Sequence, residues 1–263
     1  MARLLQQIVE EPRTCSYLAD RTASLQHRIL LDITPAELEE LLVRGWRRFG
    51  PDYFRPGCAP CHECAPTRIP TRTFVPSKSQ RRARAKCAEL RARIGPPRVD
   101  PARLALYSAW HAARERARNW ASAPIDAKGY ALQFAFPHPA AREVAYYEPA
   151  ANGERLVGIG ICDQTAHAWS AIYFFYDPAW AERSIGVANV VFQVELARRL
   201  DIDHVYLGYR VAGCPSMTYK SRFLPQERLV GWPELDEAPR WVPVPAARST
   251  SDPASPRRTG SLR

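Results

Sequence analysis

The sequence of 263 residues lacks any long hydrophobic run and any amino-terminal signal pattern. No segment approaches the roughly 18 consecutive apolar residues that a membrane span requires. Residues 1–10 hold no long apolar stretch before a small-residue cleavage site. We therefore expect a cytoplasmic protein with no membrane partner. Hydrophobic residues make up 46% of the chain, enough to bury one large core or two smaller ones, which excludes wholesale disorder.

The chain also lacks the features of a disulfide-linked secreted protein, because its seven cysteines are odd in number and follow no secretion signal. Three of them form the string Cys58-Ala-Pro-Cys61-His-Glu-Cys64, whose two-residue spacing lets neighbouring thiolates converge on one ion. With Cys15 or His62 as a fourth ligand, this spacing suits zinc or an iron-sulfur cluster. The alternative is a set of reduced cysteines in a proline-rich loop. The remaining cysteines are expected to be buried small side chains, namely Cys87, Cys162 and Cys214.

Carboxylates are scarce between residues 78 and 118, where twelve Lys and Arg accompany only three acidic residues. This stretch accounts for nearly all of the formal net charge of +10. Residues 77–84 contain no acidic side chain that would relieve repulsion along a helix, so the run costs stability unless an anion binds there. A phosphate backbone is the natural anion, and the alternative is a solvated helical face. The candidate RNA-binding residues are Lys78, Arg81, Arg82 and Arg84.

Capping patterns predict two helices in the first half of the chain. Thr34-Pro-Ala-Glu37 is a capping box with Pro at the first helical position. Asp100-Pro101 begins a second helix, in which an apolar stripe recurs every third residue at Leu104, Tyr107 and Trp110. Between these helices, residues 51–76 are dense in Pro and Cys and lack apolar periodicity, so we expect no conventional core there.

After residue 128 the pattern changes to short strands, which we expect at residues 130–136, 145–148, 156–162 and 169–176. The polar residues 163–167 should join the last two as an antiparallel hairpin. Val187, Val190, Val191 and Val194 predict an amphipathic helix to about residue 200, and residues 204–210 predict another strand. The order is β-β-α-β. Residues 246–263 are rich in Ser, Pro, Thr and Arg, and we expect them to be disordered.

The start of the predicted helix is suited to binding an anion. Arg183-Ser-Ile-Gly-Val-Ala188 opens it with small residues, which leaves free backbone N–H groups for a pyrophosphate or an RNA 3′ end. The pattern Arg-x-x-Gly-x-Ala after a strand also resembles the GNAT acyltransferase fold, in which this loop holds coenzyme A. We therefore expect an α+β protein with a GNAT-like core, an antiparallel-rich mixed sheet with flanking helices, and a small cysteine-containing amino-terminal domain. The expected boundaries are 1–76 for that domain, 77–127 for a basic helical segment, 128–240 for the catalytic core and 241–263 for a disordered basic tail.

Several strings together resemble the aminoacyl-tRNA-protein transferases of the arginyltransferase family. They are Cys15-Ser-Tyr-Leu-Ala-Asp-Arg21, Gly45-Trp-Arg-Arg-Phe-Gly50, Tyr53-Phe-Arg-Pro-Gly-Cys58, Ser170-Ala-Ile-Tyr-Phe-Phe-Tyr-Asp-Pro178, Ser184-Ile-Gly186 and Gly213-Cys-Pro-Ser-Met-Thr-Tyr-Lys220. The resemblance covers residues 4–232. The compact length and the three-cysteine string are similar to the bacterial branch, whose members move leucine from Leu-tRNA to proteins beginning with Asp or Glu and so mark them for N-degron proteolysis. Arginyl transfer is the sister activity and the first alternative.

The resemblance leaves open whether this chain binds a metal. In eukaryotic relatives an amino-terminal cysteine set is linked to an iron-sulfur cluster or another metal. This chain has Cys15-Ser-Tyr-Leu18 where those relatives have Cys-x-x-Cys. The metal-ligand candidates are therefore Cys15, Cys58, Cys61 and Cys64, with zinc or an iron-sulfur cluster as the group that they would hold.

The reaction implied by the resemblance is attack by a protein's α-amine on the ester that joins leucine to tRNA. An α-amine has a pKa of about 7.7–8.0, so a modest base and good positioning suffice, and the chemistry requires no cofactor. We assign Lys220 and Arg222, beside Tyr219, to the acidic side chain of the acceptor. The backbone near Ser184 and Gly186 would donate to the developing oxyanion.

Tyrosine hydroxyls are the other candidate donors to that oxyanion, from Tyr173, Tyr206 or Tyr209. For Tyr206 aromatic packing is the favoured alternative. Asp163 or Asp177 would orient or deprotonate the amine, and for Asp177, which precedes Pro178, a turn role is an equal alternative. The RNA-binding residues of the basic segment would hold the tRNA.

Two further functions remain open from the sequence. A GNAT N-acetyltransferase that uses acetyl-coenzyme A explains the loop at residues 183–188 but neither the basic stretch nor the cysteines. A zinc-stabilised RNA-binding protein uses the cysteines and the charge but leaves the acyltransferase-like half without a role.

Overall fold

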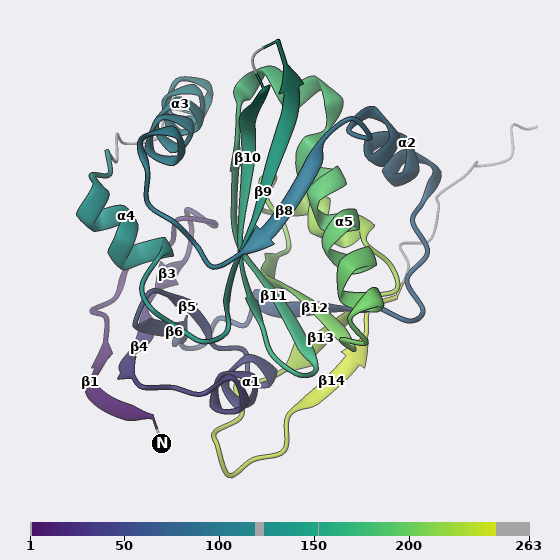
Figure 1. Ribbon diagram of the computed structural model, residues 1–263. Helices are drawn as coiled ribbons and strands as arrows, with labels where there is room; N and C mark the ends of the chain where they lie inside the picture. Colours follow the sequence, from purple (N-terminus) through teal and green to yellow (C-terminus); the bar gives the residue numbers. More distant parts are fainter. Residues whose placement is uncertain (1, 119–123, 152, 246–263) are drawn as a thin grey trace, which may run out of the picture.

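The computed structural model describes residues 2–118, 124–151 and 153–245. It is a mixed α+β fold in which helices flank a large sheet (Figure 1). Only β11 and β12 are parallel neighbours among the described strands of that sheet. The eight strands lie in the order β14 (Arg240–Pro243), β13 (Glu227–Val230), β7 (Cys64–Pro70), β12 (His204–Val211), β11 (Ala168–Tyr176), β10 (Gly153–Gln164), β9 (Ala141–Ala150) and β8 (Arg91–Gly95).

A second sheet lies in the amino-terminal part of the chain, with its four strands in the order β1 (Arg3–Val9), β4 (Leu25–Leu31), β6 (Asp52–Pro56) and β5 (Arg47–Phe49). A short pair is formed by β2 (Arg13–Thr14) and β3 (Thr22–Ala23). The helices are α1 (Pro35–Val43), α2 (Lys78–Lys86), α3 (Pro101–Arg118), α4 (Ala127–Phe134) and α5 (Ile185–Arg199), with short 3-10 helices η1 (Pro178–Arg183) and η2 (Thr218–Arg222).

Helices cover both faces of the large sheet, with α2 and α5 on one side and α3 and α4 on the other (Figure 1). The face under α5 buries an apolar cluster that includes Trp169, Val191 and Val194, each fully buried. The opposite face buries an aromatic cluster in which α3 supplies Tyr107 and Trp110. Burial of side chains of this size contributes roughly 1.5–3 kcal/mol each, so the two helical layers hold the sheet rigid.

Most of the predicted elements in the second half of the chain are confirmed. The strands at 156–162 and 169–176 lie in β10 and β11, which pair as an antiparallel hairpin, and α5 and β12 follow in the predicted order. The strand expected at residues 130–136 is wrong, because these residues lie mostly in α4. Asp126 caps that helix by accepting a hydrogen bond from Gly129, and the buried Tyr130 and Phe134 lie one helical turn apart.

The predicted capping residues also occupy their expected places. Thr34 and Glu37 form a reciprocal capping box at the start of α1. Asp100 accepts a hydrogen bond of 2.9 Å from the backbone N–H of Arg103 in the first turn of α3.

Residues 51–76 differ from the expectation that they lack a conventional core. They contain β6 and β7, and their side chains at Tyr53, Ile69 and Phe74 are 1% exposed or less. β7 pairs with β12 on one side and β13 on the other, so the amino-terminal region supplies an inner strand of the large sheet. The cysteine string therefore links the two sheets, because it runs from the end of β6 to the start of β7.

The expected tail begins later than residue 241. Residues 240–243 form β14, which pairs with β13 along the edge of the large sheet. The rest of the predicted disordered tail, residues 246–263, lies outside the described residues. Among the helices of the described part, none is long and apolar enough to span a membrane.

Candidate active site

The neighbouring strands β11 and β12 stay paired over only three residues each. Ala168 to Ser170 pair with His204 to Tyr206, and no described residue of either strand pairs with the other strand beyond that point. There β11 skips Ile172 against β10, and β12 skips Leu207 against β7. The two strands therefore separate, and we call this region, residues 171–176 and 207–211, the fork. The chain passes from β11 through η1 to α5, and α5 leads to the start of β12.

Arg47 of β5 lies across the base of the fork. Its Nη2 donates a hydrogen bond of 2.5 Å to the carbonyl of Ala171 on β11. On the β12 side, a Cβ added to Gly208 would lie 3.4 Å from the Arg47 Nε. Gly208 has a φ of +75°, so glycine both permits this backbone conformation and leaves room for the guanidinium.

The next residue, Arg48, forms a buried ion pair with Asp163 of β10. Its Nε lies 3.0 Å from one carboxylate oxygen, and its Nη2 binds the other. Arg48 is 5% exposed and Asp163 is fully buried. Asp163, predicted to orient or deprotonate the substrate amine, is thus enclosed and bound, and we do not assign it a proton-transfer role.

The predicted tyrosine donors are engaged with the protein itself. The Tyr209 hydroxyl lies 2.9 Å from the carbonyl of Gly45 and 3.1 Å from that of Phe54. The Tyr173 hydroxyl lies 3.1 Å from His111 Nε2. Burial raises the pKa of both phenols, so both stay protonated, and the single O–H of Tyr209 is used on these carbonyls.

Tyr206 and Asp177 occupy structural positions. The Tyr206 ring packs edge-on against Trp241 at 5.5 Å between centroids, and the side chain is 3% exposed. Asp177 caps η1 by accepting from the Ala179 N–H at 2.9 Å, and it also pairs with Arg155. Partial burial acts to raise the pKa of Asp177, but the hydrogen bonds from Arg155 and Ala179 outweigh it and lower that pKa. Asp177 therefore has the geometry of the turn residue that the sequence left as an alternative.

Of the three residues assigned to the acceptor, the structure places only Lys220 at the fork. Its Nζ donates a hydrogen bond of 2.6 Å to the carbonyl of Tyr209 on β12. Burial lowers the pKa of Lys220, and the positive charge of Arg47 lowers it further, to about 7. Tyr219 is 42% exposed and Arg222 is also exposed, so both lie on the surface of η2.

At the start of α5, where the sequence predicts an anion-binding site, the Ser184 N–H donates to the carbonyl of Ala181 at 2.9 Å. Ser184 adopts a left-handed conformation with φ of 58° and makes no side-chain capping hydrogen bond. A Cβ added to Gly186 would meet no atom within 4 Å. The Arg183 guanidinium pairs with Glu89, so the charge of that loop is already partly neutralised.

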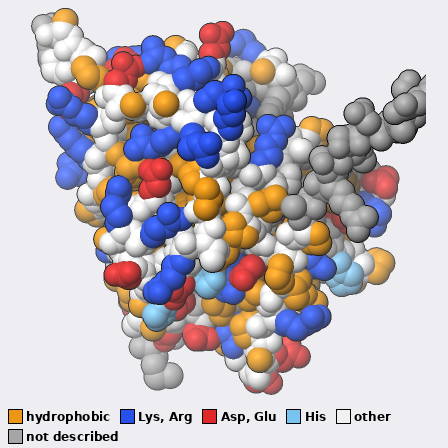
Figure 2. All heavy atoms as spheres, turned by 90° about the vertical axis from the view of Figure 1, so that its right-hand side faces the viewer, with side chains coloured by type: hydrophobic (Ala, Val, Ile, Leu, Met, Phe, Trp, Pro, Cys, Tyr) orange, Lys and Arg blue, Asp and Glu red, His pale blue; other side chains and the backbone are white. Residues whose placement is uncertain are grey.

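A basic surface covers α2 and the neighbouring strand β8. Figure 2 shows Lys and Arg side chains gathered over the upper part of this face. Its exposed cations are Lys78, Arg81, Arg82 and Lys86 of α2 and Arg91 and Arg93 of β8. Arg84, the fourth predicted RNA-binding residue, is half-buried and pairs with Glu195 at 3.3 Å.

One buried side chain ties this basic surface to the fork. Gln80, in the first turn of α2, is 3% exposed and completes a capping box with Ser77. Its Nε2 donates a hydrogen bond of 2.9 Å to the carbonyl of Arg222, the last residue of η2. Since η2 also carries Lys220, helix α2 and the fork are held in a fixed relation.

The cysteines predicted as metal ligands lie near one another. Burial raises the pKa of the Cys64 thiol to about 12, and the thiols of Cys58, Cys15 and Cys61 reinforce the effect. Cys58 Sγ is 3.3 Å from both the N–H and the carbonyl of Ser24. Over residues 2–118, 124–151 and 153–245, no three His, Cys, Asp or Glu side chains are arranged to hold an ion. In this arrangement the thiols do not form a site for a single metal ion, we derive no step through one, and the iron-sulfur cluster stays a prediction.

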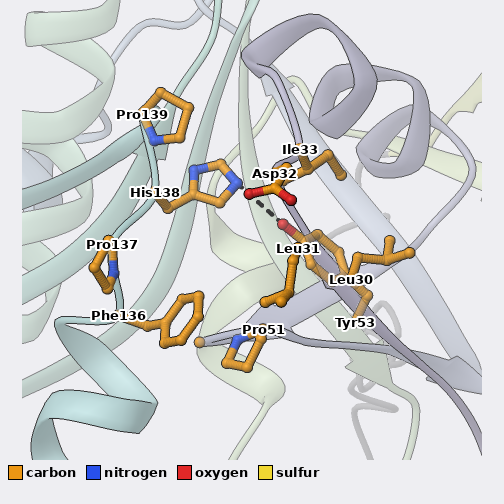
Figure 3. Close-up of a pocket in the computed structure, with 11 residues that line it drawn as sticks. Leu30, Leu31, Asp32, Ile33, Pro51, Tyr53, Phe136, Pro137, His138 and Pro139 are labelled. Carbon is orange, nitrogen blue, oxygen red and sulfur yellow. Dashed lines mark hydrogen bonds between the residues drawn. The ribbon is translucent and has the colours of Figure 1, made fainter. Parts of the chain in front are cut away.

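One cavity in the described part of the chain is lined by none of the predicted site residues. It has a volume of about 440 Å³ and lies between the end of β4, residues 50–53 and residues 136–139 (Figure 3). Tyr53 and His138 meet across it, with the hydroxyl 3.0 Å from Nε2. The Ala140 N–H donates to Nδ1, and burial, with the charge of Arg48, lowers the pKa of His138 to about 4. The imidazole is thus neutral, and the lining is mainly apolar.

Comparisons with known proteins identify the family. The model described as arginine-tRNA-protein transferase, N terminus, matches residues 13–82, and the model for the C terminus matches residues 102–230. An aspartate/glutamate leucyltransferase of Aeromonas hydrophila is 35% identical over 86% of this chain and 93% of its own. One of Chromohalobacter salexigens is 34% identical over 88% and 92%, and one of Helicobacter hepaticus is 29% identical over 90% and 97%. The chain therefore belongs to the arginine-tRNA-protein transferase family.

Proposed function

We propose that this protein transfers leucine from Leu-tRNA to the N-terminal Asp or Glu of acceptor proteins, in the cytoplasm, and so marks them for N-degron proteolysis. The family membership supports transfer from a charged tRNA to a protein. The names of the bacterial relatives support leucine as the amino acid and Asp or Glu as the acceptor residues. Arginine is the second candidate for the donor, because it appears in the description of the family.

The observation that carries this proposal is the hydrogen bond from Gln80 to the carbonyl of Arg222. It fixes a basic helix, suited to a phosphate backbone, beside the segment whose Lys220 reaches the fork. A reaction between a tRNA-borne ester and a peptide N-terminus needs these two binding regions in one rigid unit. Positioning of this kind can supply about 7–11 kcal/mol of the barrier to a reaction between two bound groups.

In the reaction, the free α-amine of the acceptor attacks the carbonyl carbon of the leucyl ester. The carbon–oxygen bond to the tRNA ribose breaks and a peptide bond forms. The attacking nitrogen loses one proton, which passes through solvent to the departing ribose oxygen and makes it a hydroxyl. Negative charge develops on the carbonyl oxygen during this step, and we assign to it the backbone N–H groups of Ile185 and Gly186, because the N–H of Ser184 already donates to the carbonyl of Ala181. Asp177, whose pKa is lowered, is not suited to accept a proton at neutral pH.

We further propose that β9 to β12 with α5 form a GNAT-like acyltransferase core. The hairpin of β10 and β11, the crossover through α5 and the parallel pairing of β12 with β11 support it. An acetyl-coenzyme A enzyme would share this core, but the Arg183 of its signature loop is paired with Glu89, while the basic surface of α2 would have no role.

The test is single-turnover transfer with labelled Leu-tRNA and Arg-tRNA, offered in parallel to peptides that begin with Asp, Glu, Asn or Lys. We expect labelled peptide only with Leu-tRNA and only with the acidic peptides. Transfer of arginine instead would favour the second candidate. Absence of transfer from either tRNA, with binding of coenzyme A in a parallel titration, would replace both with the acetyltransferase.

A further inference from the structure

The two consecutive arginines of β5 differ in how their charges are satisfied. Arg48 has its charge balanced by Asp163 in a buried ion pair. Arg47 is 8% exposed, and among the described residues its Nη1 has no hydrogen-bond partner. A buried guanidinium nitrogen without a partner is costly, because water and protein donors and acceptors normally satisfy such groups.

The surroundings of Arg47 carry an excess of positive charge. Asp163 is the carboxylate that acts on Arg47, and it is already bound by Arg48. Another cation of this region is Lys220, whose pKa is lowered by burial and, to a smaller extent, by the positive charge of Arg47. Two cations from different parts of the chain thus contact the two strands of the fork, Arg47 at Ala171 and Lys220 at Tyr209, and neither has a carboxylate partner in the described structure.

We propose that Arg47, with Lys220, binds the side-chain carboxylate of the acceptor's N-terminal Asp or Glu. The inference rests on the proposed function and names a specificity residue for it. The free Nη1 of Arg47 can donate to one carboxylate oxygen. Lys220 has three N–H groups and uses one on Tyr209, so another can donate to the second oxygen.

A carboxylate fits this place better than an RNA phosphate. Arg47 is only 8% exposed, so its surroundings are too enclosed for a phosphodiester, which would bring a ribose on either side. The exposed cations of α2 are suited to that longer ligand. Asn and Gln have the shape of Asp and Glu but no charge, so they would leave both cations uncompensated. We therefore expect peptides that begin with Asn or Gln to be much poorer acceptors.

The competing explanation is that Arg47 only fills the fork, through its hydrogen bond to Ala171. The two explanations differ in what Arg47→Met does to acceptor choice. A residue that fills space would lower transfer to Asp- and Asn-starting peptides by the same factor. A carboxylate-binding residue would lower the Asp-to-Asn ratio of kcat/KM at least tenfold, mainly through KM for the Asp peptide, and leave the KM for Leu-tRNA within twofold.

The matched control is Arg44→Met, which removes another buried arginine of the same segment. Arg44 is 8% exposed, but its guanidinium binds Glu40 and the carbonyls of Glu234, Leu235 and Glu237, away from the fork. We expect it to lower the midpoint of thermal unfolding while it keeps the wild-type Asp-to-Asn ratio. If Arg47→Met does not fold, Arg47→Lys keeps one charge, and the ratio should then fall between those of the wild type and of Lys220→Met.

Calorimetric binding of the peptides alone separates this inference from the proposed function. If the wild type transfers no leucine, the function fails, while tighter binding of the Asp peptide than of the Asn peptide, lost in Arg47→Met, still supports the carboxylate site. If transfer occurs and the ratio is unchanged in Arg47→Met, the function stands and Arg47 is only structural.

Discussion

The basic surface of α2 and the fork between β11 and β12 both present positive charge, but in different environments. On α2 the cations Arg81 and Arg82 are exposed to solvent and belong to a region with few carboxylates. At the fork, Arg47 is 8% exposed and Lys220 is half-buried. Exposed charges interact through water and are screened by salt over about 8 Å at physiological ionic strength, whereas buried charges are screened much less.

This difference assigns each region a different task. A screened, extended surface attracts a long polyanion without distinguishing its details. A buried pair of cations makes short, directional hydrogen bonds and so distinguishes a charged ligand from a neutral one of the same shape. In the proposed enzyme, the first region holds the tRNA and the second selects the acceptor.

The largest effect is expected from Asp163→Ala, which leaves Arg48 as an uncompensated buried charge. Loss of one partner from a buried ion pair should lower the free energy of unfolding by about 3–5 kcal/mol. Urea unfolding followed by circular dichroism measures it, and Asp163→Ala with Arg48→Met should recover much of the loss. A decrease in the free energy of unfolding of less than 1 kcal/mol would mean that water reaches these charges, as it reaches those of α2.

The double reversal Arg81→Glu with Arg82→Glu should weaken tRNA binding by tenfold or more at low salt, because it replaces two phosphate contacts with repulsion. The slope of log affinity against log salt should become shallower by about 2. Filter binding over a salt series gives both values. Arg240→Glu, on the exposed edge strand β14, is the matched reversal and should leave binding unchanged. Equal losses in the two proteins would remove the special role of α2.

The acceptor preference should depend on pH through Lys220. Its pKa of about 7 means that it is charged below pH 7 and becomes neutral above it, while Arg47 stays charged and Cys214 is the facing thiol. The Asp-to-Asn ratio of kcat/KM should therefore fall between pH 6.5 and 8.5, by roughly tenfold for the loss of one charge-assisted hydrogen bond. Deprotonation of the α-amine affects both peptides alike and cancels in the ratio. Lys220→Arg should make the ratio constant with pH, and persistence of the slope in that variant would contradict the assignment.

The smallest effect is expected from Glu154→Gln on β10, whose carboxylate pairs with Arg91 and Arg93 at the edge of the basic surface. Both arginines are more than 60% exposed, so the free energy of unfolding should change by less than about 1 kcal/mol. Release of these cations should tighten tRNA binding slightly at low salt. A larger stability change would show that surface charges here contribute more than exposed pairs usually do.

Much of the fold could be predicted from local patterns. The capping box at Thr34, the hairpin of β10 and β11 and the amphipathic helix α5 each depend on residues close together in the chain. The error at residues 130–136 has a local cause, because several apolar residues close together fit a strand and a helix equally well. The error at residues 51–76 has a distant cause. β7 is an inner strand only because β12 and β13, more than 130 residues later, pair with it.

The candidate site was less accessible from the sequence. Lys220 was assigned from a local string, and the structure places its ammonium group at the fork. Arg47 and Arg48 are adjacent and identical in type, and what separates them is contact with Ala171 and Asp163, 124 and 115 residues away. Asp163 could not be recognised as an ion-pair partner for the same reason. The Arg-Arg pair inside a string shared with the family was the available signal, and it did not show which arginine lacks a partner.

The most direct measurement follows two quantities in the wild-type enzyme as salt is raised from 50 to about 300 mM, a range over which exposed charges become strongly screened. One is the KM for Leu-tRNA, and the other is the ratio of kcat/KM for Asp- and Asn-starting peptides. We expect the KM to rise steeply while the ratio stays constant within twofold. If the ratio collapses in parallel with tRNA binding, the acceptor is selected by exposed charge and not by the buried cations of the fork.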